Sequence, residues 1–199
     1  MTKLVILDRD GTVNFDSPDY VRKVEDFVPI PGSLEAIARL CKAGYQVAIA
    51  TNQSGLGRGY FDMVALVAMH QKLNNLLAPL GGKVSYFAVC PHRPDADCTC
   101  RKPRPGLLDQ IAKHFNVSLR FVPIIGDSRR DLEAAVTVGG RGILVRTGNG
   151  ADAAAALAAS ARPQGRGHVE VYDDLAAAVD TLLREDVATG DDDGEPAAE

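Results

Sequence analysis

Two aspartates stand directly after a short apolar segment near the start of the chain. Residues 3–7 (KLVIL) lead into Asp8, Asp10 and Gly11, which predicts a buried strand that ends in a turn. Open α/β sheets bind their ligands at the carboxyl ends of strands. Two carboxylates one residue apart at such an end can divide the chemistry, so that one attacks and the other moves protons. Taken alone, the pattern is more typical of a solvated turn with an N-capping aspartate.

Three further segments carry polar side chains at comparable places. Thr51 follows a second apolar run, and Asp127 follows a third, with Asp131 at the start of the next predicted helix. Lys102 lies between these segments on a predicted loop. Singly, the threonine and the aspartates fit helix caps and helix dipoles, and the lysine fits a solvated surface. Together they supply a carboxylate nucleophile, an acid–base group, a magnesium site, a hydroxyl and a cation, which phosphoryl transfer from an ester requires.

In this order, the segments resemble the four signatures of the haloacid dehalogenase-like phosphatases. The matching residues are Asp8-Arg9-Asp10-Gly11-Thr12, Thr51-Asn52, Lys102, and Gly126-Asp127 with Asp131. The resemblance runs from about residue 3 to residue 148. It implies that Asp8 attacks phosphorus and becomes an aspartyl phosphate while Asp10 protonates the leaving oxygen. Asp10 then takes a proton from the water that hydrolyses this intermediate.

The same resemblance implies a metal site and a set of substrate contacts. Magnesium is expected on the carboxylates of Asp8 and Asp127 and on the backbone carbonyl of Asp10, because hard oxygen ligands suit this ion. Asp131 is expected to support that site. The phosphoryl oxygens are expected to be stabilised by Thr51 and Lys102. The remaining substrate contacts are expected from Arg101, Asn52, Gln53, Ser54 and the loop residues Asp16, Asp19 and Tyr20.

A second constellation lies just before Lys102. Cys90, His92, Cys98 and Cys100 offer three thiolates and one imidazole within eleven positions, enough for a closed tetrahedral zinc site. No ligand position stays open, so the zinc is expected to be structural and to fix the place from which Lys102 acts. The alternative is a disulfide, which the absence of a signal peptide and the strained spacing of Cys98 and Cys100 disfavour.

The zinc loop and its neighbours resemble a subgroup of the family that contains phosphatases of heptose bisphosphates and of histidinol phosphate. Residues 51–59, 101–106 and 145–148 look more like the heptose enzymes. This implies removal of the 7-phosphate of a D-glycero-D-manno-heptose 1,7-bisphosphate, a step in heptose and lipopolysaccharide precursor synthesis. Histidinol-phosphate phosphatase, in histidine biosynthesis, is the alternative, although Arg58 and Arg101 suit its cationic amine less well.

Two further alternatives differ in chemistry. A phosphomutase would keep the aspartyl phosphate for a second transfer, but it needs a closing cap to exclude water, and no segment is long enough to form one. A non-catalytic, zinc-stabilised binding module on the same fold is the third alternative, because fold alone does not establish activity. That module would be expected to lack at least one of Asp8, Asp10, Lys102 or Asp127, and all four are present.

Composition is that of a compact enzyme. The 199 residues are 46% hydrophobic, and 22 basic against 26 acidic residues give a net charge of −4. Nucleic-acid binders usually show the opposite bias, so the expected partner is a small phosphorylated sugar. No apolar run reaches the ~20 residues of a membrane span, and no targeting segment is visible. A cytoplasmic monomer is therefore expected, with no membrane partner.

Alternation of strands and helices predicts an α/β fold with a doubly wound parallel sheet. The resemblance implies its Rossmann-like form, without a cap and with a zinc-binding loop. One phosphatase domain is expected over residues 1–184, followed by a disordered acidic tail over 185–199. The expected strands are 3–7, 47–50, 84–89, 122–125, 142–146 and 168–171, and the expected helices are 33–43, 62–78, 106–115, 130–138, 151–161 and 174–184.

Overall fold

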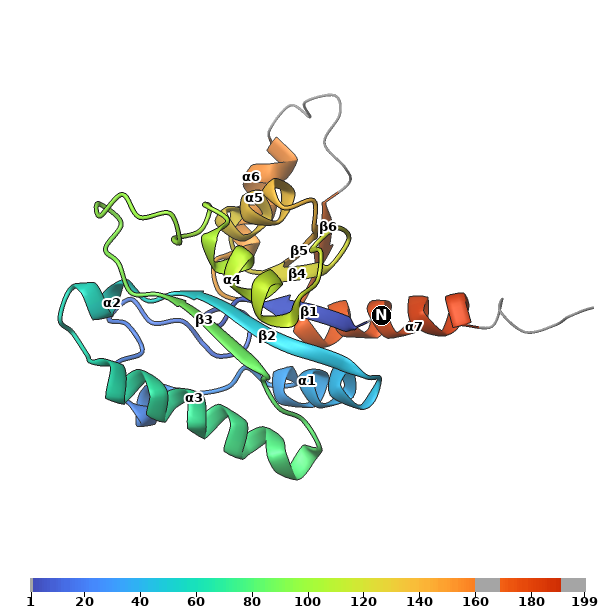
Figure 1. The fold of residues 1–199 in the computed structure, drawn as a ribbon, viewed down its shortest axis with the longest axis horizontal. Coiled ribbons are helices and arrows are strands. Elements are labelled where there is room, and N and C mark those ends of the chain that lie inside the picture. Colours follow the sequence, from blue (N-terminus) through green and yellow to red (C-terminus); the bar gives the residue numbers. More distant parts are fainter. Residues whose placement is uncertain (1, 160–168, 191–199) are drawn as a thin grey trace, which may run out of the picture.

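A six-stranded parallel sheet forms the centre of the structure, a computed structural model that describes residues 2–159 and 169–190. Its strands lie in the order β3-β2-β1-β4-β5-β6 (Figure 1). They are β1 (Lys3–Leu7), β2 (Tyr45–Asn52), β3 (Tyr86–Cys90), β4 (Pro123–Gly126), β5 (Arg141–Val145) and β6 (Glu170–Tyr172). The chain builds outward from β1 to β3 and then returns to β4 on the other side of β1. Open sheets form their ligand crevice at such a switch in strand order.

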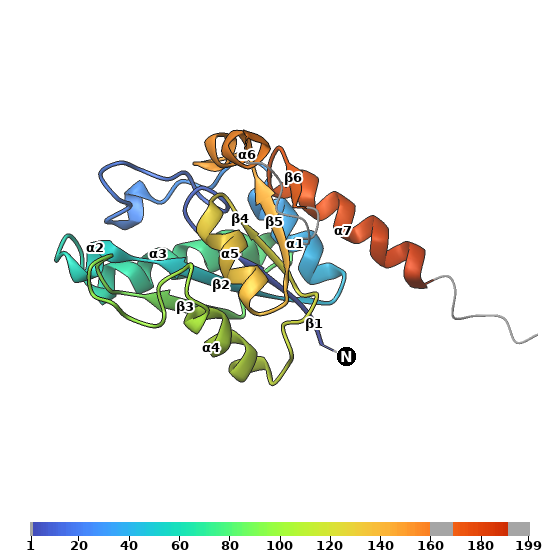
Figure 2. The same ribbon diagram turned by 90° about the horizontal axis from the view of Figure 1, so that it is seen from above.

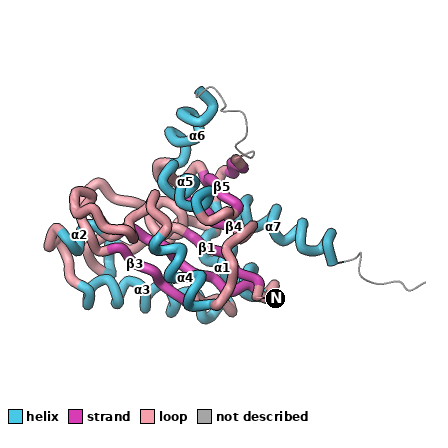
Figure 3. Tube along the Cα trace, turned by 45° about the horizontal axis from the view of Figure 1, so that its top comes forward, coloured by secondary structure: helices cyan, strands magenta, loops and turns pink. Residues whose placement is uncertain are grey.

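Helices cover both faces of this sheet (Figures 2 and 3). One face carries α1 (Ser33–Lys42), α3 (Met63–Leu77) and α7 (Leu175–Gly190). The other carries α4 (Gly106–Phe115) and α5 (Arg129–Thr137), and α6 (Gly150–Ala159) packs with α5 and β5 in a smaller cluster. The short helices are α2 (Ser54–Gly57), η1 (Val24–Asp26) and η2 (Ala78–Leu80).

The central strand β1 is apolar on both sides, as a strand between two helical layers must be. Val5 and Leu7 pack in the cluster under α1, α3 and α7, whereas Leu4 and Ile6 pack in the cluster under α4 and α5. Successive side chains of a strand point to opposite faces, which explains the alternation. Each buried aliphatic side chain contributes about 1.5–3 kcal/mol. The residue that follows β1, Asp8, therefore leaves a firmly anchored strand.

The predicted fold class is confirmed, and most predicted elements fall within a few residues of the observed ones. The predicted tail starts at residue 185, whereas α7 continues through residues 185–190. Ion pairs anchor this extension to the body of the protein, from Arg141 to Glu185 and from Lys3 to Asp186. Parts of three predicted segments, 151–161, 168–171 and 185–199, lie outside the described residues.

Within residues 2–159 and 169–190, the segments above the carboxyl ends of the strands are loops and short helices rather than an inserted domain. The longest of these are residues 8–32, which include η1, and residues 91–105, which include the predicted zinc ligands. The fold is thus capless, as predicted. None of the helices described has the length and apolar character needed to span a membrane.

Candidate active site

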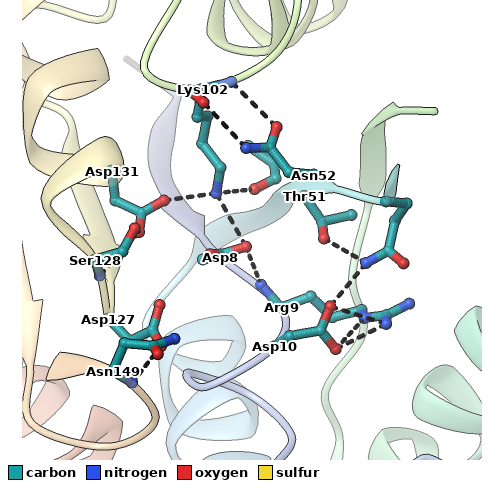
Figure 4. Close-up of polar contacts among 12 residues, drawn as sticks. Asp8, Arg9, Asp10, Thr51, Asn52, Lys102, Asp127, Ser128, Asp131 and Asn149 are labelled. Carbon is teal, nitrogen blue, oxygen red and sulfur yellow. Dashed lines mark hydrogen bonds and ion pairs between the residues drawn. The ribbon is translucent and has the colours of Figure 1, made fainter. Parts of the chain in front are cut away.

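A pocket of about 290 Å³ opens at the carboxyl ends of β1, β2 and β4. Polar side chains from four separate segments line it: Asp8 and Asp10, Thr51 to Ser54, Arg101 and Lys102, and Asp127 and Ser128. Figure 4 shows the inner members of this set converging from their strands and loops. The sheet therefore brings together the segments that sequence analysis singled out. The pocket lies at the switch in strand order between β1 and β4, where a crevice is expected.

Lys102 reaches into the centre of the site from the loop before α4. Its side chain is only 4% exposed, and Nζ lies 2.6 Å from Asp131 Oδ1 and 3.0 Å from Asp8 Oδ1. Nζ also donates a hydrogen bond to the carbonyl of Ala50 at 2.6 Å. Burial disfavours the lysine's charge, but the two carboxylates outweigh this effect and raise the pKa of Lys102. The lysine is thus held as a cation beside Asp8.

Three carboxylates surround this cation. One oxygen from each of Asp8, Asp127 and Asp131 lies within 4.8 Å of the others. The Asp131 carboxylate also accepts hydrogen bonds from the backbone N–H and hydroxyl of Ser128, which cap α5. One lysine does not balance three carboxylates, so the cluster fits a site for a hard divalent cation.

The protonation of Asp8 reflects this crowding. Burial raises the pKa of Asp8 most strongly, Lys102 lowers it, and the charges of Asp131 and Asp127 raise it further, to about 8. Burial is likewise the main reason that the pKa of Asp127 is raised. A cation placed among these groups would favour their ionised forms.

Asp127 sits in a slot between two loops. Its Oδ2 accepts hydrogen bonds from the backbone N–H and the side-chain amide of Asn149, at 2.8 and 3.0 Å. Gly11 (φ +80°) and Gly148 (φ +57°) form the walls, and a Cβ on either would lie within 2.2 Å of the same oxygen. The Thr147 hydroxyl ties the loops together by donating to the Gly11 carbonyl at 2.6 Å. Both glycines are needed for conformation and for space.

Asp10 points away from the carboxylate cluster. Its Oδ1 accepts hydrogen bonds from Arg9 Nη2 at 2.7 Å and Asn14 Nδ2 at 2.9 Å, and its Oδ2 accepts one from Gln53 Nε2 at 2.8 Å. Burial alone would raise the pKa of Asp10, but the Arg9 charge and these hydrogen bonds outweigh it and lower that pKa. The two leading aspartates therefore occupy different environments, and without a cation the pKa of Asp8 is the raised one and the pKa of Asp10 the lowered one.

The polar residues at the end of β2 line the pocket and also form hydrogen bonds with other residues of the site. The amide of Gln53 also donates to the Thr51 hydroxyl at 2.8 Å, so it links Thr51 to Asp10. The side chain of Asn52 forms two hydrogen bonds of 3.1 Å with the backbone N–H and carbonyl of Lys102. Asn52 lines the pocket, as its expected contact with substrate requires, and its amide also fixes the backbone of Lys102. Ser54 begins α2 and also lines the pocket.

Loops supply the outer wall of the pocket. Asp16 and Tyr20 line it as expected, and Arg101 lines it from the opposite loop, with Nη1 3.5 Å from the carbonyl of His92. Asp19 does not belong to this wall: its side chain is 92% exposed, and it lies 4.0 Å from Arg22. The structure therefore does not place Asp19 in the pocket lining. Arg58 and Arg130 add two more cations to the lining.

The four predicted zinc ligands converge. Cys90 Sγ lies 3.7 Å from both Cys98 Sγ and His92 Nδ1, and His92 Nδ1 lies 3.3 Å from Cys100 Sγ. Tetrahedral ligands about 2.3 Å from zinc are separated by roughly 3.7 Å, so this arrangement fits the ion. All four cysteines of the chain are free thiols, which argues against the disulfide alternative.

Sequence reasoning missed two members of the site. Asn149 follows β5, so its position at the active edge of a parallel sheet was the available signal. Arg9 was read only as part of a motif, yet its side chain is 1% exposed and is the main partner of Asp10. A charged residue between two catalytic candidates gives no sign in the sequence of whether it faces the interior or solvent.

Comparison with known proteins gives two family matches. Residues 3–128 match the polynucleotide kinase 3 phosphatase family, and residues 99–178 match the HAD-hydrolase-like family. Together the two matches span the pocket and its supporting strands.

Individual relatives are similar over almost their whole length. A D-glycero-beta-D-manno-heptose-1,7-bisphosphate 7-phosphatase of Pseudomonas putida is 48% identical over 184 residues, which cover 91% of this chain and 99% of that protein. The enzyme of the same name from Bordetella bronchiseptica is 49% identical, with coverage of 92% and 99%. The crystal structure of a B. bronchiseptica D,D-heptose 1,7-bisphosphate phosphatase, complexed with magnesium and phosphate, superposes with a TM-score of 0.85 at 48% identity, and covers 92% of this chain and 99% of that one.

Proposed function

We propose that this chain, which belongs to the haloacid dehalogenase-like phosphatases, removes the 7-phosphate of D-glycero-D-manno-heptose 1,7-bisphosphate. The observation that carries this substrate is the likeness to the heptose phosphatases, which covers 99% of the length of those relatives. The likeness includes the pocket, whose polar lining suits a phosphorylated sugar. Such a reaction supplies heptose precursors for lipopolysaccharide.

In the proposed mechanism Asp8 carries out the first step. Its Oδ1 accepts a hydrogen bond from the Arg9 backbone N–H at 2.7 Å and lies 3.0 Å from Lys102 Nζ, which leaves Oδ2 as the oxygen to attack phosphorus. As the bond from phosphorus to the sugar oxygen breaks, Asp10 gives its proton to that oxygen. The products of this step are the sugar monophosphate and an aspartyl phosphate on Asp8.

The second step returns the enzyme to its starting state. Water attacks phosphorus, the bond between phosphorus and Asp8 breaks, and the proton lost by water passes to the Asp10 carboxylate. The Lys102 ammonium and the Thr51 hydroxyl stabilise the phosphoryl oxygens in both steps. Asn52 acts on this chemistry indirectly, because it fixes the backbone of Lys102.

Magnesium would bind to the carboxylates of Asp8 and Asp127 and to the backbone carbonyl of Asp10, and it would neutralise charge on the phosphoryl group. Asp131 would support this site, since its oxygens are engaged by Lys102 and Ser128. A structural zinc on Cys90, His92, Cys98 and Cys100 would hold the loop that carries Lys102. A reducing cytoplasm suits this thiol set. We place the enzyme there as a monomer, because one chain supplies every residue of the proposed mechanism.

The second phosphate of the substrate has cationic partners available. Arg58, Arg101 and Arg130 line the outer part of the pocket, where a group remote from the reacting phosphate would lie. This charge suits a dianion and disfavours the ammonium of histidinol phosphate. The match to the polynucleotide kinase 3 phosphatase family reflects shared hydrolase chemistry, since a net charge of −4 does not favour nucleic acid.

Phosphate release tests the proposal. The purified protein is supplied with heptose 1,7-bisphosphate, heptose 1-phosphate or histidinol phosphate, each with and without magnesium. We expect magnesium-dependent release of one phosphate from the bisphosphate and little from the other two compounds. A higher kcat/KM for histidinol phosphate would replace the heptose proposal with the alternative.

A further inference from the structure

Arg9 carries a buried charge, which is costly to remove from water, and the proposed mechanism gives this residue no role. Its side chain is 1% exposed, and Nε and Nη2 lie 3.0 and 2.7 Å from Asp10 Oδ1. Nη2 also reaches Asp10 Oδ2 at 3.0 Å. Asp10 is the only acidic partner that the described residues offer to Arg9. Buried pairs of this kind are often neutral or unfavourable for stability compared with apolar residues, so stability alone is a weak reason for the pair.

The surroundings keep the guanidinium in one orientation. Arg9 Cζ lies over the ring of Phe27, 6.0 Å from the ring centroid, and Phe27 is fully buried. The turn that follows β1 wraps around the same residue, because the Arg9 carbonyl accepts hydrogen bonds from the N–H groups of Val13 and Asn14. The planar fork of arginine is suited to fixing a carboxylate, since several donors act in one rigid group.

The direction of Asp10 is the consequence. Asp8 and Asp10 leave the same strand end, yet Asp8 joins the cluster with Asp127 and Asp131, and Asp10 does not. Arg9, together with Asn14 and Gln53, draws the Asp10 carboxylate to the opposite side, as Figure 4 shows for its contacts with Arg9. A carboxylate that moves protons has to stay clear of the carboxylates that hold the cation. Positions within about 0.5 Å decide whether such a group is effective.

We infer that Arg9 is the positioning residue for Asp10: its buried guanidinium holds the Asp10 carboxylate on the leaving-group side of the site and apart from the Asp8, Asp127 and Asp131 cluster. The inference rests on the proposed function, in which Asp10 moves the protons. Substrates with different leaving groups separate the effect of Arg9 on the two chemical steps. A sugar alkoxide needs a proton as it departs, whereas p-nitrophenolate leaves without one, and hydrolysis of the aspartyl phosphate needs Asp10 in both cases.

The test uses the magnesium-loaded enzyme and the variants Arg9→Lys and Arg9→Met. Arg9→Lys keeps the charge and loses the fork. With the sugar bisphosphate we expect kcat to fall by about 10²-fold in Arg9→Met, within the range for loss of general acid–base catalysis, and by less in Arg9→Lys, with KM near the wild-type value. With p-nitrophenyl phosphate, rapid mixing should show a burst of about one equivalent of nitrophenolate, followed by slow turnover and accumulation of the phosphoenzyme.

A burst that disappears together with turnover would overturn the inference, because Arg9 would then act through Asp8 or the fold. Turnover within about twofold of wild type in both variants would overturn it as well. Arg39→Met is the matched control. Arg39 lies on α1 and forms an exposed ion pair with Asp180, so its replacement should leave both steps unchanged.

The Asp10→Asn background keeps the test decisive if Arg9→Met folds poorly. Arg9→Met/Asp10→Asn removes both charges of the pair, which is less costly than removing one. We expect this double variant to be no slower than Asp10→Asn, because Arg9 has no function once Asp10 is neutral; a further loss of 10-fold or more would overturn the inference. Near wild-type turnover in Asp10→Asn would instead refute the proposed function itself.

Discussion

Replacing Asp8, the proposed nucleophile, by asparagine should make the magnesium-free protein more stable at neutral and alkaline pH. Asp8 lies among carboxylates, which helps to raise its pKa from 3.8 to about 8 in the folded state. A group with a raised folded pKa holds its proton in the folded chain after the unfolded chain has released it. Its contribution to stability is therefore full below pH about 4 and is lost as the pH rises to about 8. Asparagine at position 8 does not titrate, so the Asp8→Asn variant does not lose stability in this way as the pH rises.

The magnitude follows from the size of the shift. One pKa unit is worth about 1.4 kcal/mol, so a shift from 3.8 to about 8 corresponds to on the order of 5 kcal/mol. The Asp8 side chain is only 15% exposed, so solvent screening removes little of this. The lowered pKa of Asp10 acts in a different window, since its contribution is lost only below its ordinary range. The free energy of unfolding should thus differ most between wild type and Asp8→Asn at pH 8.

Urea denaturation followed by far-ultraviolet circular dichroism measures the difference, because the chain has no tryptophan to report by fluorescence. In magnesium-free buffer, Asp8→Asn should gain several kcal/mol over wild type at pH 8 and only about 1 kcal/mol at pH about 4.5. Excess magnesium should narrow the gap at pH 8, because it binds and stabilises the folded wild type. A difference that stays constant over this pH range, or a wild type that is the more stable protein at pH 8, would refute the electrostatic reasoning.

Three other predictions concern the reaction and the second metal. Asp10→Asn should lower kcat for the sugar bisphosphate about 10²–10⁴-fold with little change in KM, as measured by phosphate release; an unchanged kcat would contradict its acid–base role. Elemental analysis should find one zinc per chain, and replacing Cys98 and Cys100 by serine should remove it and lower the thermal midpoint; a zinc-free wild type purified under reducing conditions would contradict the assignment. Arg101→Ala should lower kcat/KM for the bisphosphate, by a factor that corresponds to about 1.5–3 kcal/mol of lost transition-state stabilisation, and should barely change kcat/KM for a simple monophosphate ester; an equal loss on both substrates would place Arg101 in the general phosphoryl machinery.

Much of the architecture could be predicted because the informative patterns are local. Three of the four candidate catalytic segments follow an apolar run, and parallel strands put their carboxyl ends at one edge, so Asp8, Thr51 and Asp127 were expected to meet. The four predicted zinc ligands were recognisable from their spacing in the sequence, and they converge in the structure. Lys102 depended on resemblance to a family, since a lysine on a loop is ordinarily solvated, and here it is buried among carboxylates from two other segments.

The features that escaped prediction depend on partners far away in the chain. Asn52 lines the pocket as expected, but the sequence did not indicate that its amide pairs with the backbone of Lys102, 50 residues later. Acidic residues near the end of the chain resembled a disordered tail, but Glu185 pairs with Arg141 and keeps α7 helical there. Asp10 pairs with Arg9, whose side chain turns inward over Phe27, and no local sequence pattern indicates that orientation.

The hydrogen bonds that join the loop after β5 to the loops after β1 and β4 also affect folding during synthesis. Thr147 and Gly11 are joined across 136 residues, and Asn149, on the same loop, supplies both hydrogen bonds to Asp127 Oδ2. Closing so long a loop is entropically costly and belongs to the slower contacts of folding. During synthesis, a growing chain whose strands β1 to β4 have left the ribosome still lacks the loop with Thr147 and Asn149. The carboxylates would then meet before their hydrogen-bonding partner is available, so the ability to hydrolyse phosphate esters should emerge only after about three quarters of the protein has left the ribosome.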